Sequence, residues 1–177
     1  MNVKFFASLS PSSAQEYLSD FLIFGSERGV QILEKRIDSA TKMDFTLTTI
    51  APILEVLVST VETVPKSKDP SLPTWITDTA DYQNGLFDFN EESNMVILAG
   101  AYYLGETFVR NFENLRWTIG NVDYAEGNMP VVSKFKHEIE MAPIWIVENL
   151  FRRIIKDPSR LGDINTAVSL WINDVAK

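Results

Sequence analysis

The chain has 177 residues, with no cysteine, one histidine and a formal net charge of −8. The lack of cysteine excludes a disulfide framework, a thiol nucleophile and a thiolate metal site, and one histidine cannot build a histidine-based metal centre. The negative charge disfavours nucleic acid and anionic membranes as partners. The only basic run, residues 152–160, falls at an expected helix C-terminus, where cations complement the helix dipole. No apolar run approaches the ~18 residues that span a bilayer. We therefore expect a single cytoplasmic domain over residues 1–177, with no metal and no cofactor.

Helical spacing dominates the first third of the chain. Ser10 is a suitable cap and Pro11 a suitable first residue for a helix, and apolar residues follow at helical intervals. Gly25 and Gly29 are expected to interrupt this helix before a second short one over residues 26–37.

Two longer apolar patterns predict further helices. Proline is costly inside a helix, so the first of these helices is expected to begin near Thr49, with Pro52 in its first turn. The second covers residues 95–112 and is apolar over most of its circumference, which predicts a central, buried helix. Asp88 and Glu91 are spaced like a capping box before it.

In the last third of the chain, the spacing of apolar residues changes from helical to strand-like and back to helical. Short strands separated by turn residues are expected at 116–120, 130–135 and 138–141. Pro143 then begins a helix that continues to Lys156, and a last helix follows from Asp163. The sequence thus predicts an α+β fold: a mostly helical single domain with a small antiparallel sheet of about three strands.

The longest aperiodic segment, residues 64–88, is an acidic aromatic loop. No lysine or arginine occurs from Asp69 to Val109, while the same interval holds seven acidic residues. Long aperiodic loops in compact domains are usually functional or disordered. One interpretation is a solubilising loop with its aromatic side chains packed on the core. The other is a docking surface for a basic protein, with these partner-binding residues: Trp75, Asp78, Asp81, Tyr82 and Phe87.

A second candidate site lies around the end of the central helix. Glu106 precedes Arg110 by four residues, so the two can pair on one helix face, and Trp117 follows in the first expected strand. The pair could lie on an exposed edge, or it could be partly buried and orient a ligand. We expect Trp117 to pack between the sheet and the central helix.

These patterns leave three functions open. No catalytic triad, phosphate-binding loop or dinucleotide fingerprint occurs, so no residue is assigned as catalytic. The leading hypothesis is a non-enzymatic interaction protein, such as an immunity-like or antitoxin-like inhibitor of a basic partner. The alternative is a small-molecule binder or enzyme that uses the Glu106 site. A third is a subunit that forms a homodimer through exposed apolar helix faces.

A helix with a Tyr-Leu-Gly-Glu motif and a basic residue precedes a tryptophan strand, a valine-rich strand, a turn and a proline-initiated helix. In this chain the elements are Tyr103-Leu104-Gly105-Glu106, Arg110, Trp117, Pro130-Val131-Val132 and Pro143. This order over residues 99–153 resembles a group of uncharacterised bacterial proteins. The turn before the last strand differs, since it holds Lys136-His137 where small residues are usual. The resemblance implies the α+β layout and no activity.

Overall fold

The computed structural model describes residues 3–38, 41–66, 68, 70–79 and 87–175. Over these residues the chain is a mostly helical α+β protein, as the sequence predicts, and its buried apolar side chains form one connected core. The α-helices are α1 (Val3–Ala7), α2 (Pro11–Phe24), α3 (Val30–Arg36), α4 (Ile50–Val58), α5 (Thr74–Thr77), α7 (Glu91–Asn111), α8 (Pro143–Lys156) and α9 (Asp163–Asn173). Short strands form two separate antiparallel pairs: β1 (Thr63–Pro65) with β2 (Phe87–Phe89), and β3 (Arg116–Ile119) with β4 (Pro130–Ser133).

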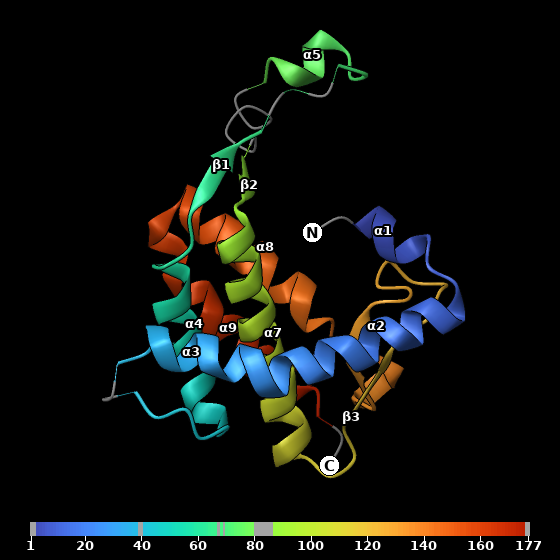
Figure 1. Cartoon of the computed structure of the whole chain (residues 1–177), viewed down its shortest axis with the longest axis vertical. Helices are drawn as coiled ribbons and strands as arrows, with labels where there is room; N and C mark the ends of the chain where they lie inside the picture. Colours follow the sequence, from blue (N-terminus) through green and yellow to red (C-terminus); the bar gives the residue numbers. More distant parts are fainter. Residues whose placement is uncertain (1–2, 39–40, 67, 69, 80–86, 176–177) are drawn as a thin grey trace.

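The central helix is α7, as predicted. It lies among α3, α4 and α8 (Figure 1), and the side chains of Tyr103 and Phe108 are fully buried. The predicted cap is wrong, because Asn90 rather than Asp88 caps this helix. The Asn90 side-chain oxygen accepts a hydrogen bond from the Ser93 amide at 2.8 Å. Asp88 instead lies in β2, where its carboxylate pairs with cations.

Two predictions for the first third of the chain concern helix boundaries, one set by proline and one by glycine. The α4 helix begins at Ile50 with Pro52 in its first turn, as expected. Gly25 and Gly29, however, do not interrupt the first helix: they bound a π-helical turn that joins α2 to α3 in one continuous rod. Gly25 is needed for packing, because a Cβ there would lie 2.1 Å from the Tyr102 ring.

The C-terminal sheet has two strands rather than about three. The expected third strand, residues 138–141, contributes only an isolated bridge between Val132 and Met141. The reason is local backbone conformation, since His137 and Glu138 both have positive φ values, 58° and 57°. An extended strand cannot run through residues in that region.

The segment between β1 and β2 projects from the helical body (Figure 1). We call the described residues from Thr63 to Phe89 the arm. Its base is the β1–β2 ribbon, in which Val64 pairs with Asp88, and α5 lies near its far end. The sequence predicts an irregular loop here, without the ribbon.

Candidate functional site

The arm carries an exposed tryptophan near its tip. Trp75 lies in α5 and is 75% exposed, the most exposed of the large apolar side chains among the described residues. Leu72, just before α5, is also exposed. Asp81 and Tyr82, the other predicted docking residues of this region, lie outside the described residues. Because the arm carries Trp75 away from the core, this ring can contact another molecule without rearrangement of the fold.

The acidic residues of the arm have cationic partners within the arm. Lys68 lies 2.9 Å from Asp78, and Lys66 lies 3.2 Å from Asp88. Both lysines precede Asp69, where the interval without lysine or arginine begins. In the folded chain they nevertheless pair with acidic residues of that interval. The arm therefore has a weaker negative field than the sequence interval indicates. All four side chains stay substantially exposed.

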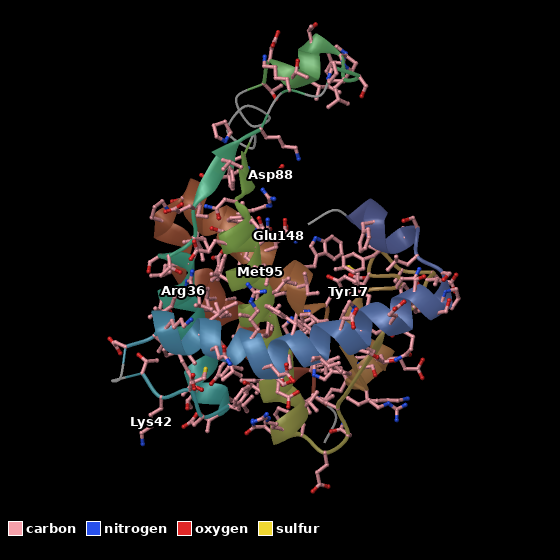
Figure 2. All side chains as sticks on the ribbon, viewed as in Figure 1. Tyr17, Arg36, Lys42, Asp88, Met95 and Glu148 are labelled. Carbon is pink, nitrogen blue, oxygen red and sulfur yellow. The ribbon has the colours of Figure 1, made fainter. Side chains whose placement is uncertain are left out.

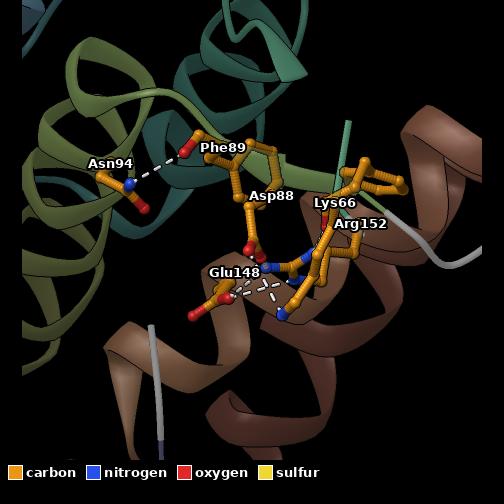
Figure 3. A network of polar contacts seen from close by, with 7 residues as sticks. Lys66, Asp88, Phe89, Asn94, Glu148 and Arg152 are labelled. Atoms are coloured by element: carbon orange, nitrogen blue, oxygen red, sulfur yellow. Dashed lines mark hydrogen bonds and ion pairs between the residues drawn. The ribbon is translucent and has the colours of Figure 1, made fainter. Parts of the chain in front are cut away.

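Arg152 of α8 fastens the base of the arm to the helical body (Figure 3). Its guanidinium donates to Glu148 Oε1 at 2.9 and 3.0 Å, to the Phe87 carbonyl at 2.9 Å and to Asp88 Oδ1 at 3.2 Å. It also lies over the rings of Phe87 and Phe89, at 5.3 and 4.9 Å from their centroids. Of the predicted docking residues, Phe87 thus belongs to the base of the arm rather than to its tip.

At the base of the arm, negative and positive side chains lie next to one another. Asp88 lies where the arm leaves the body, and Glu148 is close by on α8 (Figure 2). Burial acts to raise the pKa of Asp88, but hydrogen bonds and positive charge from Lys66 and Arg152 outweigh it, so that pKa lies below its usual value. Glu148 is only 7% exposed, and a buried carboxylate needs a partner such as Arg152.

Sequence reasoning missed the role of Arg152. The sequence explains the basic run by the helix dipole alone, which is a local effect. One signal was available, because Glu148 and Arg152 are four residues apart on one predicted helix. The contacts to β2 join residues more than 60 positions apart in the chain, and no sequence period reports such pairs.

The structure brings Glu106, Arg110 and Trp117 together, as the sequence predicts. Arg110 Nε donates to Glu106 Oε1 at 2.8 Å, and the Trp117 indole nitrogen donates to Glu106 Oε2 at 3.1 Å. The Arg110 guanidinium also lies 3.9 Å from the centroid of the Phe45 ring. Both carboxylate oxygens of Glu106 are therefore engaged within the chain.

Aromatic packing closes this cluster on its other side. The Trp117 ring lies against Gly105, where a Cβ would be 2.2 Å from the ring. The centroids of the Trp117 and Phe21 rings are 5.5 Å apart. Burial raises the pKa of Tyr102, and the negative charge of Glu106 raises it further. Both effects favour the neutral form of the phenol, and Arg110 partly opposes them.

Three of the hollows lined by described residues lie away from the Glu106 cluster. A groove of about 370 Å³ lies between α8 and α9, and its walls are mainly apolar. A hollow of about 540 Å³ between α3 and the start of α7 has charged walls of both signs. A third, of about 460 Å³, borders the β3–β4 pair.

Two further features bear on cofactors and membranes. Within the described residues, no group of three or more His, Asp or Glu side chains is arranged to hold a metal ion. No helix in the described part of the chain combines the length and apolarity needed to cross a membrane.

Comparisons with protein-family models, with curated proteins and with solved structures each give no match to this chain.

Proposed function

We propose that the chain is a non-enzymatic interaction protein that binds a basic partner protein through the tip of its arm. An immunity-like or antitoxin-like inhibitor would act in this way. The observation that carries the proposal is Trp75, which is 75% exposed on a short helix near the end of the arm. Tryptophan is among the residues most often found as energetic anchors of protein interfaces.

The fixed base of the arm supports this proposal. Arg152 bonds to a side chain of its own helix and to both backbone and side chain of β2. A binding element held in its bound direction loses less conformational entropy on association than a free loop does. Fixing the base of the arm therefore lowers the entropic cost of binding through the arm.

The charge of the whole chain supports a basic partner more than the charge of the arm does. Asp78 and Asp88 are paired with lysines inside the arm, whereas the chain as a whole carries −8. A net field of this kind attracts a positively charged protein over several ångströms and speeds its encounter.

The arrangement around Glu106 supports a structural role rather than the ligand-binding alternative. The carboxylate is 18% exposed and already accepts from Arg110 and Trp117. Each carboxylate oxygen of Glu106 thus already accepts one hydrogen bond from within the chain. The small-molecule function stays a prediction, with the three residues named above as its site.

Affinity purification from the native host tests the proposal, with wild type, Trp75→Ala and Tyr124→Ala as bait. Tyr124 is a matched control, because it is also an exposed aromatic residue, at 60%, in a turn of the body. We expect a basic protein to be retained by wild type and Tyr124→Ala and lost with Trp75→Ala. Equal retention of every protein by all three baits would refute docking through the tip.

A further inference from the structure

The groove between α8 and α9 has the size and lining of a small-molecule site. Ligand pockets usually have volumes of about 300–1,000 Å³, with apolar and aromatic walls and a few polar groups. This groove has a volume of about 370 Å³. Its larger apolar lining residues are Trp145, Ile146, Leu150, Leu170 and Trp171. Leu170 is 60% exposed and both tryptophans are partly buried, so a molecule in the groove can contact all three.

The two tryptophans lie at the same end of the groove, next to Glu140. Trp145 is in the first turn of α8, and Glu140 comes just before that helix. Trp171 is in the last turn of α9. The backbone amide of Lys136 donates to the Asp174 carbonyl at 2.8 Å. This bond holds the end of α9 beside the segment that leads into α8.

A second carboxylate lines the same end of the groove. The backbone amide of Asn121 donates to Glu140 Oε2 at 2.9 Å, and Glu126 belongs to the turn that Asn121 begins. The Glu126 side chain is partly buried, and its carboxylate has no hydrogen-bond or ion-pair partner among the described residues. A charge that is partly removed from water is stabilised when an opposite charge binds beside it.

Positive charge in the groove lies at the opposite end. Arg153 is the one cation among the described lining residues, and it lies in the last turn of α8. From Pro143 to Arg153 the helix axis advances by about 15 Å. Because the screening length is ~8 Å at physiological ionic strength, Arg153 has little effect on the field at the tryptophan end. That end therefore favours a cation.

We propose that the groove binds a hydrophobic ammonium ion, a small organic cation with an apolar tail. Its positive charge lies near Glu126 and Glu140 and against Trp145 and Trp171, since indole is the strongest aromatic partner for a cation. Its tail lies along Leu150. At ~30 Å³ for each heavy atom, the share of a water molecule in the liquid, the groove of about 370 Å³ holds about a dozen heavy atoms.

The proposal does not depend on the binding of a basic partner through the arm. None of the described lining residues of the groove belongs to the arm. The purified full chain can therefore be tested with ligands alone, and the outcome is separate from that of the affinity purification.

NMR titration of the ¹⁵N-labelled full chain tests the proposal. The probes are hexyltrimethylammonium and hexylammonium, with 1-hexanol and hexanoate as the neutral and the anionic molecule with a similar tail. We expect at least one ammonium ion to bind about tenfold tighter than 1-hexanol, and hexanoate to bind most weakly. The indole N–H signals of Trp145 and Trp171 should shift, whereas those of Trp75 and Trp117, outside the groove, should not.

Substitutions of Leu170 separate the effect of charge from an effect on folding. Leu170 is exposed, so both charged variants should fold, as thermal unfolding can check. Leu170→Lys should weaken binding of the ammonium ion by about threefold or more, and Leu170→Glu should strengthen it by a similar factor. Damage to the groove would instead weaken binding in both variants.

Glu126→Gln tests the carboxylate without a large change in shape. Binding of the ammonium ion should weaken by about fivefold, because the amide keeps the size of the side chain and removes its charge. Glu113→Gln is the matched control, since Glu113 is exposed and lies outside the groove. Its affinity for the ammonium ion should equal that of wild type.

Three results would overturn the proposal. The first is that neither ammonium ion binds tighter than 1-hexanol. The second is that hexanoate binds tightest and Arg153→Ala abolishes its binding, which would make the groove an anion site. The third is that Leu170→Lys and Leu170→Glu change the affinity in the same direction, which would show that charge does not select the ligand.

Discussion

At the scale of single residues, Gly105 sets how closely the sheet approaches the central helix. Glycine inside a helix ordinarily costs ~1 kcal/mol relative to alanine, so Gly→Ala in α7 would stabilise an isolated helix. Here a Cβ would lie 2.2 Å from the Trp117 ring and 3.0 Å from Pro143. We expect Gly105→Ala to destabilise the protein by ~1–3 kcal/mol, as overpacking does.

Urea unfolding measures this effect, with Gly162→Ala as the control. A Cβ at Gly162 would meet nothing within 4 Å. The control should therefore be neutral or slightly stabilising. If Gly105→Ala were as stable as this control, the Trp117 ring could not lie where the structure places it.

The two bonds to Glu106 should differ in strength, although they share one carboxylate. The Arg110 side chain is 50% exposed, so its pairing with Glu106 should contribute only ~0.3–0.5 kcal/mol. The Trp117 ring is partly buried, and a hydrogen bond to a charged group contributes ~1.5–3 kcal/mol. Double-mutant cycles with Glu106→Gln, Arg110→Ala and Trp117→Phe should give the larger coupling for the tryptophan. The reverse order would show that the ion pair, rather than the indole bond, holds this cluster.

At the scale of elements, the joint between the arm and α8 depends on Arg152. Arg152→Ala would leave Glu148 as a buried carboxylate without its guanidinium partner, and β2 would lose two bonds to α8. We expect a loss of ~1–3 kcal/mol and faster amide exchange in β1 and β2, with α7 unaffected. Arg153→Ala is the matched control, since its side chain is exposed on the same helix and has no hydrogen bond or ion pair with the described residues of the arm. Equal exchange in the two variants would contradict the role of Arg152.

The joint should also respond to acid through Asp88. Its pKa is lowered in the folded chain by Lys66 and Arg152. A lowered pKa contributes stability that is present above the unfolded value of about 3.9 and is lost as the pH falls through the folded value. The difference in unfolding free energy between wild type and Asp88→Asn should therefore be constant near neutral pH and shrink below about pH 4. Urea unfolding at several pH values measures it. A difference that grew on acidification would reverse the sign of the interaction.

The sequence predicts those elements whose formation depends on residues close together in the chain. The α7 and α8 helices and the start of α4 follow from apolar spacing and proline geometry within one segment, and the prediction was confirmed for each. Glu106 and Arg110 are four residues apart on one helix, so their contact could be predicted too. The β1–β2 ribbon and the Arg152 joint depend on residues brought together from distant positions. The prediction of a third strand was wrong because His137 and Glu138 have positive φ values, which the residue types alone do not indicate.

The charge of the whole molecule should govern how fast the partner arrives, and Trp75 how long it stays. The arm holds Asp78 against Lys68, whereas the net charge of −8 extends over the whole chain. Rising salt should slow association, because screening shortens the reach of the field to ~8 Å at physiological ionic strength. Asp78→Asn should slow association modestly, because it removes one negative charge and leaves the positive charge of Lys68 on the arm. Trp75→Ala should mainly speed dissociation. Stopped-flow or surface-based kinetics with the protein that co-purifies measures both rates. If salt left association unchanged while Trp75→Ala still sped dissociation, the tip would be the anchor and the partner would not be basic. If Trp75→Ala dissociated like wild type, the arm would not be the docking element.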